Sequence, residues 1–254
     1  MKRAMSSGNV QPVTGFVLHR RAYQESSFLV DMLSVELGKI RFVARGMRSA
    51  KSDRKSVLQP FQLVTCELAG SGELKSLRNA DMQGKTVPLK HSALFCGMYV
   101  NELLNRCLPA NIPCPDLLAQ YHQAITQLSI THAEHANVDA IPSNSLARHH
   151  EAALRMFELA LLDELGYMPD FSADAKTQRE IEMDMEYVFV ADKGVMLKQF
   201  NPHLPAFSGQ ILHDILNQHW HPDSLKISKW ITRQALQPLL GSKPLKSREL
   251  FVSK

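Results

Sequence analysis

The sequence predicts an α+β protein with several domains, in which a small closed β-barrel is followed by a mostly α-helical domain that carries a small β-hairpin. Three observations predict this class. Apolar residues alternate with period two through the first third of the chain, no helix fits between most of these short runs, and after Pro88 the apolar period becomes helical. We expect a barrel domain over residues 1–82 and a helical domain over residues 83–254, with the hairpin at residues 170–200.

Five alternating runs account for the barrel. They begin at residues 16, 28, 40, 61 and 73 and end at residues 18, 32, 44, 68 and 80. Gly38 and Gly46 mark turns between them, and Gly70-Ser71-Gly72 forms a tight turn before the last run. Short strands at this spacing with glycine-bearing turns are typical of a small closed barrel, and the oligonucleotide-binding fold (OB-fold) is the candidate.

Five helices are predicted in the second domain, over residues 94–107, 117–128, 145–165, 208–216 and 223–240. Ser145, Ser208 and Asp223 are expected to cap the last three, and Gly166 suits the left-handed position past a helix end. A polar loop is expected at residues 129–144. The Asp192-Lys193-Gly194 turn predicts a hairpin over residues 187–197.

Charge is distributed in blocks along the chain. Residues 1–90 hold 15 Lys and Arg against 7 Asp and Glu, residues 91–200 hold 7 against 15, and residues 201–254 hold 7 against 3. The net charges are therefore +8, −8 and +4, which together give the overall +4. Because a polyanion responds to the local charge within a Debye length, the N-terminal third is the expected nucleic-acid surface.

The densest basic segment covers residues 39–55, where seven Lys and Arg accompany a single acid, Asp53. Such a segment can bind a phosphate backbone by releasing counterions, although a solvated basic loop would look the same in sequence. Further basic residues fall on neighbouring predicted strands. The candidate DNA-binding residues are Arg20, Arg21, Lys39, Arg41, Arg45, Arg48, Lys51, Arg54, Lys55, Lys75 and Arg78.

Aromatic residues on the same strands could stack on bases. Tyr23, Phe28, Phe42 and Phe61 are available, but core packing is the favoured role, since Phe28 and Phe42 lie on the apolar register of their strands.

No pattern for catalysis or a cofactor is found. The chain has no phosphate-binding loop, nucleophile elbow, dinucleotide fingerprint or Cys-x-x-Cys pair, and its histidine groups lack the spacing of zinc hydrolases. The acids at positions 180, 182, 184 and 186 could bind magnesium in a metal-dependent nuclease, but a solvated strand face is favoured. We therefore expect no metal, no cofactor and no enzymatic activity.

Arg155 lies on a helix otherwise rich in apolar residues, so it is expected beside exposed apolar surface. There its guanidinium could take a carboxylate of a partner peptide, with Leu159 one turn further on as a second contact. The alternative is an ion pair with Glu151 or Glu158 on the same helix. A terminal basic segment, with Lys243, Lys246 and Arg248, could be a second DNA contact or a clasp between domains.

The segment before the first strand has charge but no apolar run, so no secretory signal is expected, and no window reaches the length of a membrane span. Four unclustered cysteines suit a reducing cytoplasm.

Motifs distributed over more than 200 residues resemble the RecO recombination-mediator family of bacterial DNA repair. They are Gly15-Phe16-Val17-Leu18-His19, Tyr23 with Glu25 and Ser26, Val43-Ala44-Arg45-Gly46 with Arg48, Leu58-Gln59-Pro60-Phe61, Gly72-Glu73-Leu74-Lys75-Ser76-Leu77, Tyr99-Val100-Asn101-Glu102-Leu103-Leu104, Phe157-Glu158, Leu165-Gly166-Tyr167 and Lys243-Pro244-Leu245-Lys246-Ser247-Arg248-Glu249-Leu250. Their order and spacing, more than any single motif, carry the resemblance.

The resemblance implies a non-enzymatic mediator, cytoplasmic and associated with the nucleoid, that binds single-stranded and double-stranded DNA. It also implies annealing of strands coated by single-stranded DNA-binding protein, and loading of RecA together with RecR. Many members hold a four-cysteine zinc site in the region matching residues 170–205, where this chain has no cysteine, so it is similar to the zinc-free branch. Arg155 matches an arginine implicated in docking the acidic tail of single-stranded DNA-binding protein. An RNA-binding OB-fold protein remains the main alternative.

Overall fold

The structure is a computed structural model that describes residues 10–47, 56–70, 72, 74–84, 88–130 and 145–251. Four candidate DNA-binding residues, Arg48, Lys51, Arg54 and Lys55, lie outside these ranges, as does most of the predicted polar loop. The chain forms two compact units, Met1–Ile125 with Ser247–Lys254, and Thr126–Lys246. Each unit is described separately below.

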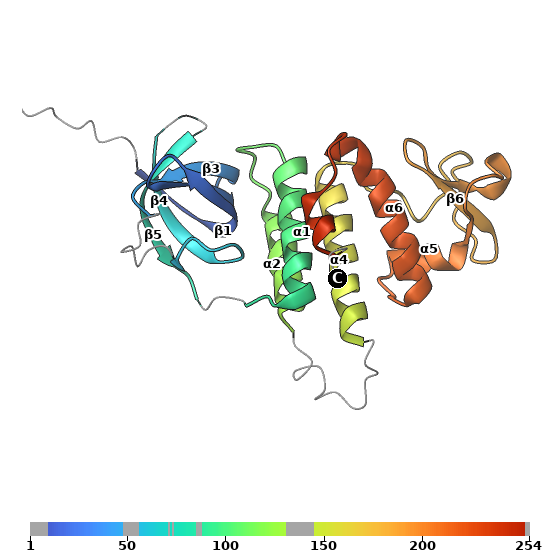
Figure 1. Ribbon diagram of the computed structural model, residues 1–254. Helices are drawn as coiled ribbons and strands as arrows, with labels where there is room; N and C mark the ends of the chain where they lie inside the picture. Colours follow the sequence, from blue (N-terminus) through green and yellow to red (C-terminus); the bar gives the residue numbers. More distant parts are fainter. Residues whose placement is uncertain are drawn as a thin grey trace, which may run out of the picture. The chain divides into compact units, whose positions relative to one another are not determined.

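The first unit contains a closed five-stranded barrel (Figure 1). Its strands are β1 (Val10–Tyr23), β2 (Ser27–Ser34), β3 (Gly38–Ala44), β4 (Leu63–Ala69) and β5 (Leu74–Met82). The strand order is β1-β2-β3-β5-β4, with β4 pairing back to β1. The β3–β5 pairing is parallel and the other four are antiparallel. The predicted OB-fold-like barrel is therefore confirmed.

The barrel core follows the period-two alternation of the sequence, because successive side chains of a strand point to opposite faces. Val30, Met32 and Phe42 are fully buried, and Phe28 packs in the same cluster. The expected core role of Phe28 and Phe42 is therefore confirmed. Gly38 opens β3 with φ +66°, and a Cβ there would lie 1.8 Å from the carbonyl oxygen of Ile112, so the turn requires glycine.

The fourth strand begins later than the alternation predicts. Phe61 has φ +69°, so the extended backbone starts only at Leu63. Phe61 nevertheless stays buried, and its N–H donates to the carbonyl of Val17 at 2.9 Å. The prediction of a strand from residue 61 is wrong because a left-handed residue interrupts the ladder while keeping its side chain in the core.

The first unit also contains α1 (His91–Cys107) and most of α2 (Pro115–Ser129), within which the boundary falls after Ile125. A buried asparagine joins them to the barrel. Asn101 of α1 donates to the carbonyl of Leu18 at 2.7 Å and accepts the hydroxyl of Tyr121 at 2.8 Å. The compact units thus divide after Ile125, whereas a boundary after residue 82 is predicted from the change of period and stays a prediction.

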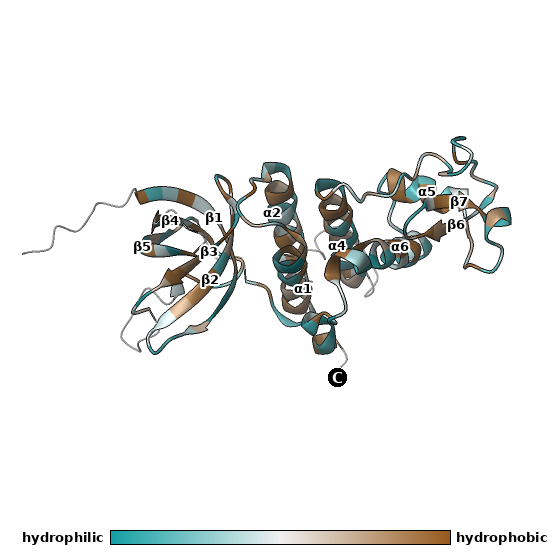
Figure 2. Ribbon diagram, turned by 90° about the horizontal axis from the view of Figure 1, so that it is seen from above, coloured by the Kyte–Doolittle hydropathy of each residue, from teal (hydrophilic) through white to brown (hydrophobic). Residues whose placement is uncertain are grey.

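The second unit contains α4 (Ser145–Glu164), a three-stranded sheet and two further helices, α5 (Gly209–Leu216) and α6 (Pro222–Leu240). The sheet consists of the predicted hairpin, β6 (Glu186–Val190) and β7 (Gly194–Leu197), and of β8 (Phe207–Ser208), which is too short to be recognised in sequence. Polar and apolar residues take different sides of the helices, as Figure 2 shows by teal and brown.

Two predicted helix ends in this unit agree with the structure and one differs. Ser208 is the N-cap residue of α5, as predicted. Gly166 has φ +74° and follows α4, as predicted. The cap of α6 is His221 and not Asp223, which lies in the first turn. Pro222 occupies the first helical position, where the fixed φ of proline is helical. The helix therefore begins one residue earlier in the chain than predicted.

A buried carboxylate, that of Asp174, stabilises the cysteine-free region at residues 170–205. Asp174 accepts hydrogen bonds from the backbone N–H groups of Lys176 and Thr177, from the Thr177 hydroxyl, and from the N–H of Leu197 on β7. These bonds attach the loop before β6 to the sheet. No helix in the described ranges is long and apolar enough to span a bilayer.

Candidate nucleic-acid interface

A hollow of about 430 Å3 lies on the outer face of the barrel. Strand pairing assembles it, since Asp31 of β2 is opposite Arg41 of β3, and Arg41 is opposite Leu74 of β5. The lining residues are Tyr23, Leu29, Asp31, Lys39, Ile40, Arg41, Leu74, Ala110 and Asn111. This is the strand 2–3 face with which OB-folds bind oligonucleotides.

An ion pair lies at the centre of this face. The Arg41 Nε atom donates to Asp31 Oδ1 at 2.6 Å, and His19 Nδ1 lies 3.9 Å from Asp31 Oδ2. The Arg41 side chain is 52% exposed, whereas that of Asp31 is 10% exposed. Arg41 is therefore held at its Nε end while its outer end faces solvent.

Lys39 lines the same hollow, but its ammonium group already makes a hydrogen bond within the protein. Its Nζ donates to the carbonyl of Asn105, in the last turn of α1, at 2.8 Å. Burial lowers the pKa of Lys39, against a smaller opposing effect of Asp31. Lys39 thus attaches the barrel face to the end of α1, in addition to any contact with phosphate.

The strand register separates the other predicted residues by face. Arg20 pairs with the core residue Val30 and Lys75 with Phe42, so both lie on the inward register, opposite to that of Arg41. The Arg20 guanidinium carbon lies 5.0 Å from the centre of the Phe28 ring. Burial lowers the pKa of Arg20.

Three further basic residues are exposed: Arg21 on β1, Arg45 in the turn after β3, and Arg78 on β5. The structure therefore brings Arg21, Lys39 and Arg41 to the outer register, and leaves Arg20 and Lys75 on the other. Asp31 was not recognised from sequence, where a single acid between apolar residues gives no signal. Tyr23, one of the predicted aromatic platforms, is the one that lines the hollow.

The environment of Arg155 differs from the prediction. Arg155 is 3% exposed, so the expectation that its charge lies at exposed apolar surface is wrong. Its Nη2 donates to Glu158 Oε1 at 2.7 Å, which is the alternative ion pair considered above, and Glu158 Oε2 accepts the hydroxyl of Thr232 on α6. The Nε and Nη1 atoms of Arg155 are buried and have no hydrogen-bond partner among the described residues. Leu159, the second predicted contact, is also buried, with 8% exposed.

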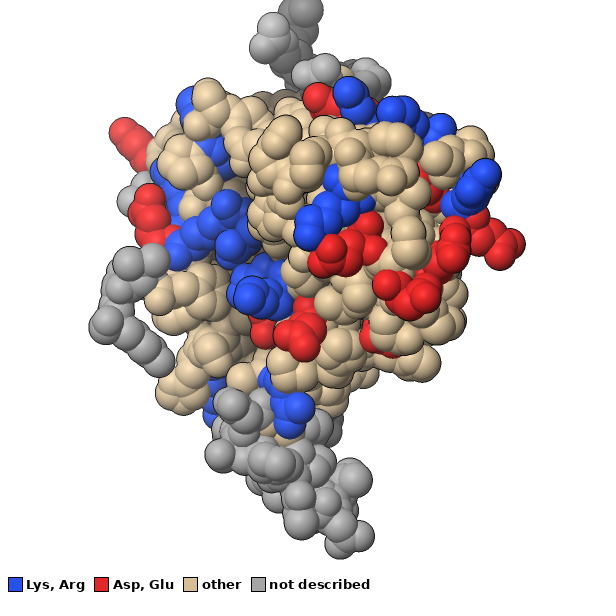
Figure 3. Space-filling model, turned by 90° about the vertical axis from the view of Figure 1, so that its right-hand side faces the viewer, with Lys and Arg blue, Asp and Glu red and all other residues tan. Residues whose placement is uncertain are grey.

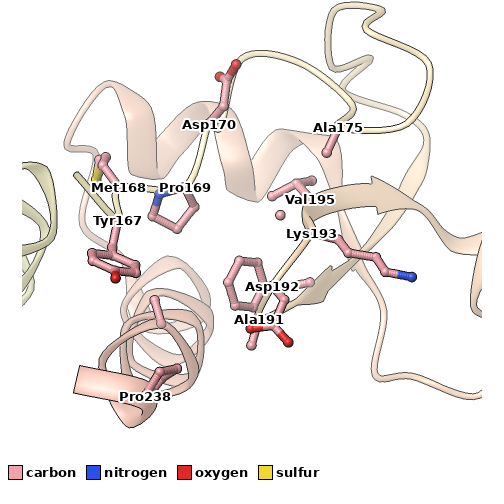
Figure 4. A pocket seen from close by; sticks show the side chains of 13 residues that line it. Tyr167, Met168, Pro169, Asp170, Ala175, Ala191, Asp192, Lys193, Val195 and Pro238 are labelled. Carbon is pink, nitrogen blue, oxygen red and sulfur yellow. The ribbon is translucent and has the colours of Figure 1, made fainter. Parts of the chain in front are cut away.

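A second hollow, of about 420 Å3, lies between residues 167–170, the β6–β7 turn and α6. Figure 4 shows the charged ends of Asp170 and Lys193 pointing away from it, so its lining is mostly apolar. Arg155 and Leu159 are not among the described residues that line it. The predicted peptide-binding residues and this hollow are thus separate features.

The acids suggested for a nuclease do not converge. Glu180, Glu182, Asp184 and Glu186 are all exposed, and Glu186 pairs with Lys198 at 2.8 Å. Within the described ranges, no three His, Cys, Asp or Glu side chains are placed to hold a metal ion. Figure 3, which views the right-hand side of Figure 1, shows both acidic and basic side chains on this face.

The terminal basic segment is attached to α1. The backbone N–H and the hydroxyl of Ser247 donate to Glu102 Oε2 at 2.8 and 2.6 Å. Lys243 and Lys246 are exposed and Arg248 is half-buried. In this segment Ser247 is therefore fixed by hydrogen bonds, while Lys243 and Lys246 are exposed.

The strand order and the basic outer face of the barrel define a protein of the oligonucleotide-binding-barrel class, extended by a helical region. Two family models match the chain, Recombination protein O N terminal over residues 10–84 and Recombination protein O C terminal over residues 90–249. The chain belongs to the RecO family of DNA repair proteins.

Curated relatives agree with this assignment. The DNA repair protein RecO of Pseudoalteromonas atlantica is 41% identical over 95% of this chain and 94% of its own length. That of Alteromonas mediterranea is 38% identical over 97% and 99%, and that of Vibrio cholerae 37% identical over 93% and 91%. The resemblance stated from the sequence motifs is confirmed.

Proposed function

We propose that this protein is a cytoplasmic, nucleoid-associated mediator of DNA repair and homologous recombination that acts by binding, without catalytic turnover. It binds single-stranded and double-stranded DNA on the barrel, anneals complementary strands coated by single-stranded DNA-binding protein, and with RecR promotes RecA loading. The observation that carries the proposal is the outer face of β2 and β3, where Arg41 and Lys39 border a hollow of nucleotide-compatible size.

Electrostatics accounts for the sequence-independent part of this binding. Each phosphate neutralised by Lys or Arg contributes about 0.7 to the salt slope on single strands and about 0.9 on duplex DNA. Annealing follows when two strands are held at high local concentration while their mutual repulsion is screened.

The test is a salt titration of oligonucleotide binding by fluorescence anisotropy. Charge reversal to Glu at Arg21, Arg41 and Arg45 together is expected to weaken binding to every sequence and to lower the single-strand slope by up to about 2. The matched control reverses three exposed cations of the second unit, Lys193, Lys226 and Arg233. Unchanged affinity and slope in the first variant would refute DNA binding by the barrel.

The alternatives are separated by two simple measurements. Competition between DNA and RNA oligomers of one sequence distinguishes the mediator from an RNA-binding OB-fold protein, since the latter prefers RNA. Incubation of end-labelled DNA with magnesium or manganese tests the nuclease, because a mediator leaves strand length unchanged.

The acidic tail of single-stranded DNA-binding protein is proposed to dock on the helical region at Arg155 and Leu159. Support comes from the two buried guanidinium nitrogens of Arg155, whose pairing with a carboxylate would recover the free energy lost by burying them without a partner. Because Arg155 is buried, the tail must displace neighbouring side chains to reach it. Annealing of strands coated with the cognate protein, compared with the same protein lacking its tail, tests the proposal: equal rates contradict it.

A further inference from the structure

We propose that the hollow on the barrel binds one unstacked nucleobase of single-stranded DNA, and that Asp31 is the positioning residue that presents Arg41 to this base. The inference rests on the proposed function, because it names the ligand group of a face already assigned to nucleic acid. A phosphate-binding surface alone does not explain one charge on this face.

That charge is Asp31, an acid at the centre of the basic face. A carboxylate near phosphates is repulsive, so a surface that only neutralises a backbone would bind better without it. Asp31 is buried, with 7% of the whole residue exposed, and it lies opposite Arg41 in the strand register. Its shortest contact with a cation is the one to Arg41, at 2.6 Å, against 3.9 Å to His19.

The contact between the two residues is at one end of the guanidinium. Asp31 Oδ1 accepts from Arg41 Nε at 2.6 Å, and Arg41 makes no other hydrogen bond or ion pair within the described part of the chain. The two terminal NH2 groups, with their four N–H donors, are left to point outwards. A planar fork fixed in this way matches the acceptor edge of a base, as arginine does with guanine.

The rest of the hollow suits the flat face of a base. Leu74 supplies exposed apolar surface, the buried Leu29 is part of the same lining, and Tyr23 adds an aromatic ring. Leu74 is 48% exposed, so its side chain is accessible to a ligand at this face. Stacking on an aromatic side chain is tolerant of sequence, so within this hollow only the Arg41 fork would favour one base over another.

The substitution Asp31→Asn separates positioning from simple electrostatics by the sign of its effect. It raises the net charge by one, so a purely electrostatic face would bind DNA equally or more tightly. If Asp31 orients Arg41, affinity for a fluorescein-labelled single strand of about 15 nucleotides falls about five- to a hundredfold, the range of one bidentate base contact. Glu67→Gln, at an exposed acid of β4, makes the same charge change and is expected not to weaken binding.

A second variant keeps the test valid if Asp31→Asn perturbs folding. Arg41→Lys keeps the charge at a half-exposed position but removes the fork, and it is expected to lose affinity in the same range. An oligomer of abasic nucleotides keeps the phosphates but offers no base, so neither variant is expected to bind it more weakly than the wild type. Melting temperatures from circular dichroism establish that the variants are folded.

The outcomes distinguish this inference from the function on which it rests. If the wild-type protein shows no salt-dependent DNA binding, the proposed function fails. If the wild type binds DNA and folded Asp31→Asn and Arg41→Lys bind it as tightly, the function stands and Asp31 is not a positioning residue. An equal loss on the abasic oligomer would assign Arg41 to phosphate and overturn the base-binding hollow.

Discussion

The substitution Arg155→Ala is expected to destabilise the second unit strongly, because it leaves a carboxylate buried without its counter-charge. Glu158 is 0% exposed, and in the wild type it accepts from Arg155 at 2.7 Å and from the Thr232 hydroxyl. Removing one partner of such a buried pair costs about 3–5 kcal/mol. Replacing both residues, as Arg155→Met with Glu158→Leu, removes both charges and is expected to have an effect near zero.

Urea unfolding followed by tryptophan fluorescence measures this difference. The chain has two tryptophans, Trp220 and Trp230, and both lie in the second unit. Trp230 on α6 packs edge-on against Phe189 of β6, with ring centres 6.1 Å apart, so its fluorescence reports the packing of this unit. The single variant is expected to unfold at a much lower urea concentration than the double variant.

Two results would refute the reasoning: an Arg155→Ala protein within about 1 kcal/mol of wild type, or a double variant as unstable as the single one. The comparison also decides how peptide binding by Arg155 variants is interpreted. A loss of tail affinity in Arg155→Ala has meaning only at a urea concentration and temperature where that variant is folded.

Three other outcomes follow from the structure. Gly38→Ala is expected to lower the melting temperature in circular dichroism by several degrees, because the left-handed φ costs about 1–2 kcal/mol and the added Cβ meets a backbone carbonyl; an unchanged value would contradict the turn. Burial raises the pKa of Asp174, but hydrogen bonds from three backbone N–H groups and the Thr177 hydroxyl outweigh it and leave the pKa below its ordinary value. The stability that Asp174 contributes is therefore full at pH 7 and is lost as pH falls below about 4, so the deficit of Asp174→Ala in urea unfolding should narrow with acidification, and a pH-independent deficit would refute this. Burial raises the pKa of Cys66 to about 12 and that of Cys107 to about 11, so both thiols should react slowly with a disulfide reagent at pH 8 and fast in urea, whereas rapid native labelling would show an open structure.

Local sequence signals were sufficient where each element buries one face. The alternation at residues 28–32 and 40–44 predicted β2 and β3, and Gly166 marked the end of α4. The same signal misplaced the start of β4, because Phe61 is buried by tertiary packing although its backbone is left-handed. Two residues are too few to show a period, so β8 gave no signal.

The candidate site was predicted only as a composition. Sequence showed that the first third of the chain is basic, but strand pairing decided that Arg41 faces the hollow while Lys75 lies on the opposite register. It also placed Asp31 against Arg41, which are ten residues apart in the chain. The ion pair of Arg155 and Glu158 was one of the two alternatives that helical spacing allowed.

The sequence by itself thus determined the class of fold, the basic character of the barrel and the family, because these depend on periodicity, charge and ordered motifs along the chain. The tertiary structure alone decided which cations share a face and which charges are buried. Register and burial depend on residues far apart in sequence: Arg41 became part of a site because β2 and β5 lie on either side of β3, and Arg155 became part of a core because α6 covers Glu158 with Thr232.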